Sequence, residues 1–87
     1  MFFDRIVTQQ SEDYEQLSPG ETKQINITKP NGYDHGVLIG ISGGGSWNTC
    51  ELVGVYSPTG YYPYAVKVKD TNSGSQNVYV KCLWFKI

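Results

Sequence analysis

Apolar and polar residues alternate along several short segments of this chain, which is the pattern of β-strands with one buried face. The clearest case is residues 64–70, where Tyr64, Val66 and Val68 are predicted to face inward and Lys67 and Lys69 outward. The predicted strands are residues 21–29, 36–42, 50–56, 64–70 and 78–87, with a weaker sixth at residues 2–8. Segments rich in Gly, Pro, Asn and Ser separate them, a spacing that favours an all-β fold. We therefore predict a small antiparallel β-sandwich, jelly-roll-like, with five to six strands in one domain over residues 1–87.

The two-residue period of an extended strand also assigns faces to two of these segments. In residues 36–42, one face carries Val37, Ile39 and Ile41, and the other carries Leu38 and Gly40. In residues 50–56, one face carries Cys50, Leu52, Gly54 and Tyr56, and the other carries Glu51, Val53 and Val55.

The segment before the first confident strand has no such alternation. Residues 11–17, "SEDYEQL", begin with Ser11 as a candidate helix N-cap and are followed by the terminating "SPG" of residues 18–20. We interpret residues 11–17 as a loop or one helical turn, and residues 1–17 as a possible N-terminal arm.

The last predicted strand is apolar on both faces. One face carries Val78, Val80, Cys82 and Trp84, and the other carries Tyr79, Leu83, Phe85 and Ile87. A strand of this kind must be covered on both sides, whereas a two-sheet sandwich covers only the inner face of each sheet. Either the N-terminal arm, with Phe2, Phe3 and Ile6, packs on the outer face, or a second or third copy of the chain does. The second alternative makes the face of Tyr79, Leu83, Phe85 and Ile87 a candidate oligomer interface.

Charge and targeting signals exclude several partners. The 87 residues include seven basic and eight acidic side chains, for a net charge of −1, with no basic stripe of the kind that nucleic-acid binding needs. No apolar run is long enough for a membrane-spanning helix. The start, "MFFDRIVTQQ", lacks the charged and apolar regions of a signal peptide. We expect a protein made in the cytoplasm of its cell, without a membrane span.

Residues capable of catalysis or metal binding are few. His35 lies next to Asp34, where side chains of an extended chain point apart, and we interpret it as an exposed loop histidine rather than a general base. Cys50 and Cys82 are too few for a zinc site, and they are in phase with apolar neighbours, which favours two buried reduced thiols over a disulfide. We predict no enzyme activity, no cofactor and no metal.

The aromatic residues of the connections are the better candidates for binding. Trp47 follows three glycines, and Tyr61, Tyr62 and Tyr64 surround Pro63. Exposed rings can stack on sugars or anchor a protein partner, but rings at the ends of a small sandwich can also close its core. The sequence leaves both roles open for Trp47, Tyr61, Tyr62 and Tyr64.

The order of these features resembles the small β-domains at the C-terminal ends of phage tail-fibre and related virion proteins. The resemblance covers residues 17–87. It includes the turn "KPNGY" (29–33), the strand "GVLIGI" (36–41), a Gly/Ser-rich loop, and two strands joined through Asn72 and Ser73. It implies a non-catalytic binding or structural module of a virion, made in the host cytoplasm, often trimeric, that assembles with virion proteins or attaches to a host surface. The alternative is a monomeric carbohydrate-binding module that uses the loop aromatics.

Overall fold

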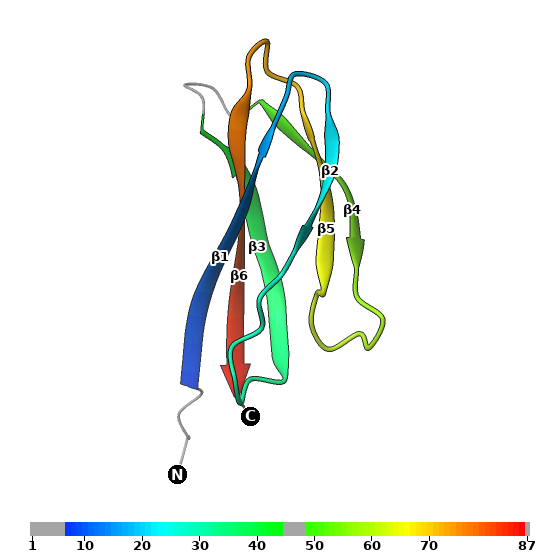
Figure 1. The fold of residues 1–87 in the computed structure, drawn as a ribbon. Helices are drawn as coiled ribbons and strands as arrows, with labels where there is room; N and C mark the ends of the chain where they lie inside the picture. The colour runs from blue at the N-terminus through cyan, green and yellow to red at the C-terminus, as the bar shows by residue number, and fades with distance from the viewer. Residues whose placement is uncertain (1–6, 45–48, 87) are drawn as a thin grey trace.

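The computed structural model describes residues 7–44 and 49–86, and this part of the chain contains strands and connections without helix. The six strands are β1 (Val7–Leu17), β2 (Thr22–Asn26), β3 (His35–Gly43), β4 (Cys50–Tyr56), β5 (Ala65–Asp70) and β6 (Gln76–Lys86). They form two three-stranded antiparallel sheets that lie face to face (Figure 1). The predicted small antiparallel β-sandwich is therefore confirmed.

The strand order explains the jelly-roll-like shape. One sheet, called sheet A here, has the order β1-β6-β3, and the other, sheet B, has the order β2-β5-β4. The first and last strands pair with each other, and the second pairs with the fifth, so the chain is rolled up from its ends. Only the β4–β5 connection stays within one sheet. The central strands β5 and β6 are consequently flanked on both sides.

The core lies between the two sheets and is built largely from the inner faces of these central strands. The fully buried apolar side chains include Val66 and Val68 of β5 together with Val78, Val80, Cys82 and Trp84 of β6. Leu17 and Ile25 close the core from the sides of β1 and β2. The alternation predicted for Val66 and Val68 of β5 and for the inner face of β6 is confirmed, whereas Tyr64 lies before β5 and is exposed.

Two β-bulges overturn the faces predicted for β3 and β4. The register of β3 against β6 shifts between Leu38 and Gly40, so Ile41 packs on the core with Leu38, while Val37 and Ile39 are exposed. A bulge adds one residue to a strand, and every side chain after it changes face. The grouping of Val37, Ile39 and Ile41 on one face is therefore wrong.

The same shift occurs in β4, where the register against β5 changes between Leu52 and Gly54. Val55 pairs with the buried Val66, and Gly54 and Tyr56 turn to the outer face of sheet B. The prediction that Leu52, Gly54 and Tyr56 share a face is wrong for the reason that applies to β3.

The prediction for residues 11–17 is also wrong, because these residues belong to the eleven-residue strand β1. β1 pairs along its whole length with β6, and its inward positions from Gln9 to Glu15 carry polar side chains, whereas Leu17 at its end is buried in the core. Of the weak strand at residues 2–8, Val7 and Thr8 lie in β1 and residues 2–6 lie outside the described residues. The described part of the predicted arm lies beside β6 in the same sheet, so it does not cover the outer face of β6.

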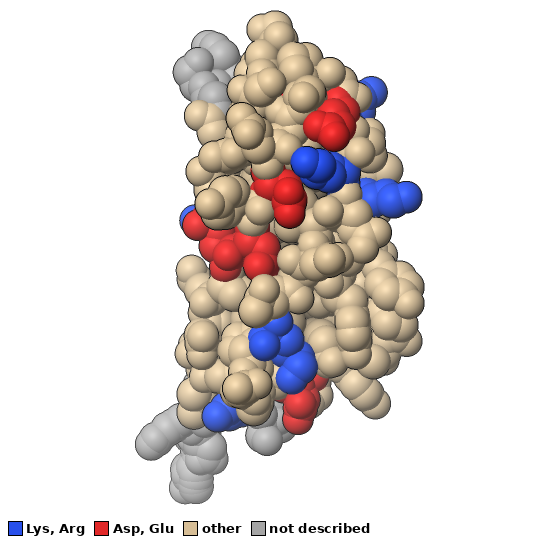
Figure 2. Space-filling view, in the orientation of Figure 1, with Lys and Arg blue, Asp and Glu red and all other residues tan. Residues whose placement is uncertain are grey.

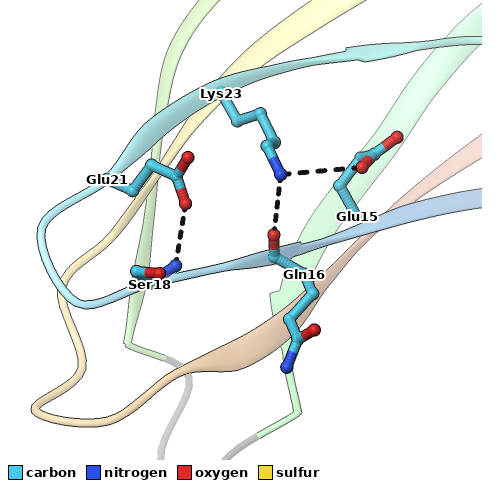
Figure 3. A network of polar contacts seen from close by, with 5 residues as sticks. All are labelled: Glu15, Gln16, Ser18, Glu21 and Lys23. Atoms are coloured by element: carbon cyan, nitrogen blue, oxygen red, sulfur yellow. Dashed lines mark hydrogen bonds and ion pairs between the residues drawn. The ribbon is translucent and has the colours of Figure 1, made fainter.

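Polar contacts join the inner side of β1 to β2. Lys23 of β2 makes an ion pair with Glu15 (3.8 Å) and donates a hydrogen bond to the carbonyl oxygen of Gln16 (3.0 Å), as Figure 3 shows. In the turn between the strands, the amide of Ser18 donates to Glu21 Oε1. These contacts close one side of the sandwich without an apolar surface, and inward-pointing charges also discourage pairing with another chain at this edge.

The end of the sandwich that carries the glycine loop is closed by a buried polar contact. Gln76 Nε2 donates to Asp70 Oδ1 and to the carbonyl oxygen of Thr49, both at 2.9 Å. A Cβ atom at Gly43 would lie 2.5 Å from Gln76 Oε1. The first glycine of the loop is therefore needed for packing against Gln76.

Candidate functional site

The predicted binding aromatics come from two connections, and the described residues of these connections lie at opposite ends of the molecule. Gly44 and Thr49, the described residues on either side of the glycine loop, lie at the end where β6 begins. Tyr61, Tyr62 and Tyr64 lie in the β4–β5 connection at the opposite end (Figure 1). Trp47 itself lies outside the described residues. The tyrosines must therefore be assessed by themselves.

The three tyrosines have different roles in the structure. The rings of Tyr62 and Tyr64 stack with centroids 4.7 Å apart, and their hydroxyl oxygens share a hydrogen bond of 2.6 Å, which raises the pKa of Tyr64. Tyr62 also lies 5.6 Å from the ring of the buried Trp84, so it caps the core. Tyr61 and Tyr64 are both exposed, Tyr64 less so than Tyr61. The core-capping alternative thus applies to Tyr62, and a contact role remains open for Tyr61 and Tyr64.

His35 is not the exposed loop histidine of the prediction. It is the first residue of β3 and is half-buried. Its ring stacks on Phe85 at 5.6 Å and is tilted against Tyr61 at 5.5 Å. The histidine therefore lies between Phe85 on the outer face of sheet A and Tyr61 of the β4–β5 connection, which is called the tyrosine loop here.

The predicted interface residues of β6 lie together on that outer face. Tyr79, Leu83 and Phe85 are half-buried, while Ile87 lies outside the described residues. On β3, Val37 is paired with Leu83 and is 49% exposed, and Ile39 at the bulge is 51% exposed. The outer face of sheet A therefore carries apolar side chains of β3 and β6 that no described residue covers.

Polar and aromatic contacts add detail to this face. Tyr14 of β1 packs against Tyr79 with ring centroids 5.3 Å apart. Lys81, between Tyr79 and Leu83 on the same face, makes a 3.9 Å ion pair with Glu12. A contacting surface would thus meet apolar groups around one ion pair.

A third surface was missed by the sequence analysis. The outer face of sheet B has an open depression of about 340 Å³. Its outward-facing lining consists of Gln24, Gly54, Tyr56, Ala65 and Lys67. A glycine in the interior of a strand is a known sign of close approach by a ligand or another backbone. Gly54 was therefore the available signal, but its assignment to the face of Leu52 concealed its meaning.

The two cysteines are the remaining candidates for chemistry among the described residues. Both cysteines are free thiols, with Cys82 buried and Cys50 only half-buried. Burial raises the pKa of both thiols, to about 11 for Cys82, which suppresses the reactive thiolate. Within residues 7–44 and 49–86, no three His, Cys, Asp or Glu side chains gather as metal ligands. On the face drawn in Figure 2, charges of both signs are interspersed among uncharged residues.

The fold and these surfaces define a small jelly-roll-like β-sandwich with one apolar sheet face and one indented sheet face. No protein-family model, curated protein or solved structure matches the chain. The resemblance to phage tail-fibre domains therefore stays a prediction from the sequence. No helix in the described chain could cross a membrane.

Proposed function

We propose that this protein is a non-catalytic binding and structural module that self-associates through the outer face of sheet A. The observation that carries this proposal is the position of β6. This strand is central in its sheet and its inner face is buried, while its outer face carries Tyr79, Leu83 and Phe85 around Lys81 and is covered by no described residue of the chain. Strands of this composition occur where both faces are covered.

The neighbours of β6 extend the apolar surface. Val37 and Ile39 of β3 lie on one side, and Tyr14 of β1 lies on the other beside Tyr79. A second copy of the chain presents apolar surface of the same kind, and most soluble homo-oligomers close with point-group symmetry. The resemblance to phage tail-fibre domains favours a homotrimer, located in a virion and acting in assembly or in attachment to a host surface.

The test compares two exposed valines of similar accessibility. Val37 (49% exposed) lies on the proposed interface, and Val53 (52% exposed) lies on the opposite sheet. We expect Val37→Asp and Leu83→Asp to reduce the mass measured by sedimentation equilibrium to that of one chain, because each buries an unpaired carboxylate in the interface. Val53→Asp should keep the parental mass. A monomeric parent protein, or a Val37→Asp variant of parental mass, would contradict self-association through this face.

The second candidate function is carbohydrate binding, and the exposed tyrosines favour it. Tyr56 and Tyr61 are exposed, and Tyr64 lies between Tyr56 and the core-capping Tyr62. Exposed aromatic rings with hydroxyl groups offer both a flat apolar surface and hydrogen bonds to a sugar. These rings do not include Trp47, which lies outside the described residues.

A further inference from the structure

We propose that the depression on the outer face of sheet B binds a single hexose unit of a glycan. The inference deepens the second candidate function and rests on it, but it moves the site from the tyrosine loop to the sheet. The depression has a volume of about 340 Å³, which is at the lower end of the range for small-molecule sites. It is therefore suited to one sugar ring rather than to a large ligand.

Two of the residues that line the depression, Gly54 and Ala65, have little or no side chain. Gly54, Lys67 and Gln24 form one row across the three strands, and Tyr56 and Ala65 belong to the next row on the same face. Because Gly54 has no side chain and Ala65 has only a methyl group, the sheet surface between the two rows is flat. A pyranose ring presents a flat face of C–H groups that can lie on such a surface.

Neither packing nor backbone conformation explains the glycine at position 54. A Cβ atom there would meet nothing within 4 Å, in contrast to Gly36, where it would lie 2.6 Å from the ring of Trp84. Positive φ angles occur at other glycines of the described chain, not at Gly54. A glycine inside a strand costs roughly 0.5–1 kcal/mol of stability relative to alanine. We therefore infer that the open space above Gly54 is occupied by a ligand.

The bulge of β3 offers a comparison, because Gly40 also lines an open depression, of about 190 Å³. Gly40 also follows a bulge and also has open space around its Cβ position. The next outward residue after Gly40 is Ser42, whereas the corresponding residue after Gly54 is Tyr56. Only the glycine of β4 therefore lies beside an aromatic ring in its own strand.

The ring of Tyr56 is positioned by a chain of aromatic contacts. Tyr56 is 62% exposed, and its ring meets Tyr64 edge-on with centroids 6.3 Å apart. Tyr64 in turn stacks on Tyr62, which packs against the buried Trp84. A ring held in this way loses little conformational entropy when a ligand stacks on it, and preorganisation is a general source of affinity.

The rim supplies polar groups without an acidic side chain. Gln24 Nε2 donates to Asn26 Oδ1 at 2.9 Å, which holds the Gln24 amide beside the depression. Lys67 adds an ammonium donor on the same row. An aromatic wall, a flat floor and a few hydrogen-bonding groups form a set suited to a hydroxylated ring, because each apolar face and each hydroxyl of the ring then finds a partner.

The site and the proposed self-association surface lie on opposite sheets, so both can be occupied at once. An oligomer built through sheet A would carry one copy of the depression on the outside of each subunit. Linked sites of this kind raise the avidity for a surface that displays many sugars, even when each site is weak.

The test uses a variant that fills the depression and a matched variant that does not. Saturation-transfer NMR would be recorded with methyl glycosides of glucose, galactose and mannose and with their short oligosaccharides. We expect at least one of them to bind the parent protein with a Kd on the order of 1 mM, which is ordinary for one small ligand unit. Gly54→Val should weaken this binding at least tenfold, because its side chain occupies the space of the ring, and Tyr56→Ala should do the same.

Gly40→Val is the control, because it adds the same side chain after the bulge of the other sheet, also into open space. It should leave the Kd for free sugars unchanged. Unchanged thermal stability of Gly54→Val would show that lost binding is not lost folding. The proposal is overturned if no sugar of the panel binds the parent, or if Gly54→Val binds as the parent does. If Gly54→Val binds sugars as the parent does while Tyr61→Ala loses binding, the protein still binds carbohydrate, but its site lies in the tyrosine loop instead of the depression.

Discussion

Trp84 determines which residue types are allowed at three distant positions. Its indole N–H donates to Ser11 Oγ at 2.7 Å, so the buried donor is satisfied by a small hydroxyl on β1. Its ring lies where a Cβ atom of residue 36 would be, so β3 needs a glycine there. Tyr62 covers the remaining edge of the ring. The largest core side chain is thus fitted by contacts with β1, β3 and the β4–β5 connection.

The close approach at Gly36 leads to a first prediction. Gly36→Ala places a Cβ atom 2.6 Å from Trp84 Cε3, and the fully buried indole has little space to move. We expect a loss of about 1–3 kcal/mol in the free energy of unfolding, the usual cost of overpacking a core. Gly40→Ala, four residues further along β3 in open space, should change it by less than about 0.5 kcal/mol. Urea unfolding of both variants measures the difference, and equal stabilities would contradict the proposed contact.

The buried thiol of Cys82 leads to a prediction about alkaline pH. Burial, with a smaller contribution from Asp13, raises the pKa of Cys82 from 9.0 to about 11. Between these values the unfolded chain has lost the thiol proton and the folded chain retains it. This contribution to stability is therefore complete below pH 9 and is lost as the pH rises towards 11.

The measurement is the free energy of unfolding against pH for the parent and for Cys82→Ala. The variant should be less stable at neutral pH because of the cavity, but its stability should fall less steeply in the alkaline range. Parallel curves for the two proteins would show that Cys82 does not contribute to the alkaline loss.

At the scale of the elements, the two open sides of the sandwich are built differently. Between β1 and β2 the inward positions are polar and joined by hydrogen bonds and an ion pair. On the other side, β4 exposes apolar residues along its length: Leu52, Val53, Val55 and Tyr56. The first side is closed within the chain, while the second side leaves apolar surface and the depression on sheet B accessible.

Asp13 tests the polar closure of the first side. Its carboxylate accepts hydrogen bonds from the amide and the hydroxyl of Thr28 at 3.1 and 3.0 Å. Asp13→Ala should cost about 1 kcal/mol, since these bonds are partly exposed to water, and should speed hydrogen exchange of the β1 amides. Glu12→Ala, which removes an exposed ion pair on the outer face of the same strand, should have a smaller effect. An equal effect of the two variants would show that the contact with Thr28 does not hold β1.

At the scale of the whole molecule, the two sheets turn different outer faces to the surroundings. Sheet A presents Val37, Leu83 and Phe85, whereas sheet B presents Lys67, Gln24 and the ring of Tyr56. The proposed self-association and the proposed sugar site are therefore separable by mutation. Val37→Asp should abolish association and keep the Kd for a free sugar, and Gly54→Val should have the opposite pair of effects.

Much of the fold follows from local patterns. The strands β2, β5 and β6 were predicted because apolar and polar residues alternate at consecutive positions. The apolar side chains on both faces of β6 follow from the same pattern. The sequence also placed the candidate interface of Tyr79, Leu83 and Phe85 on one face of β6, which the structure confirms as a shared face. Their role in association stays a prediction.

The strand β1 and the faces of β3 and β4 could not be predicted in this way. The inward residues of β1 are polar because their partners are Trp84, Thr28 and Lys23, which come from distant parts of the sequence. A bulge is defined by the register against a neighbouring strand, and the only local signals of these two were Gly40 and Gly54, which follow the extra residues Ile39 and Val53.

The sequence by itself determined that the chain is all-β and that its last strand carries apolar side chains on both faces, because side-chain alternation is a property of consecutive residues. Only the tertiary structure decided which strands are neighbours, that Tyr62 closes the core, and that Tyr56 lies beside Gly54. Strand pairing joins residues far apart in the chain, so the surfaces that it creates exist only once the two sheets have formed.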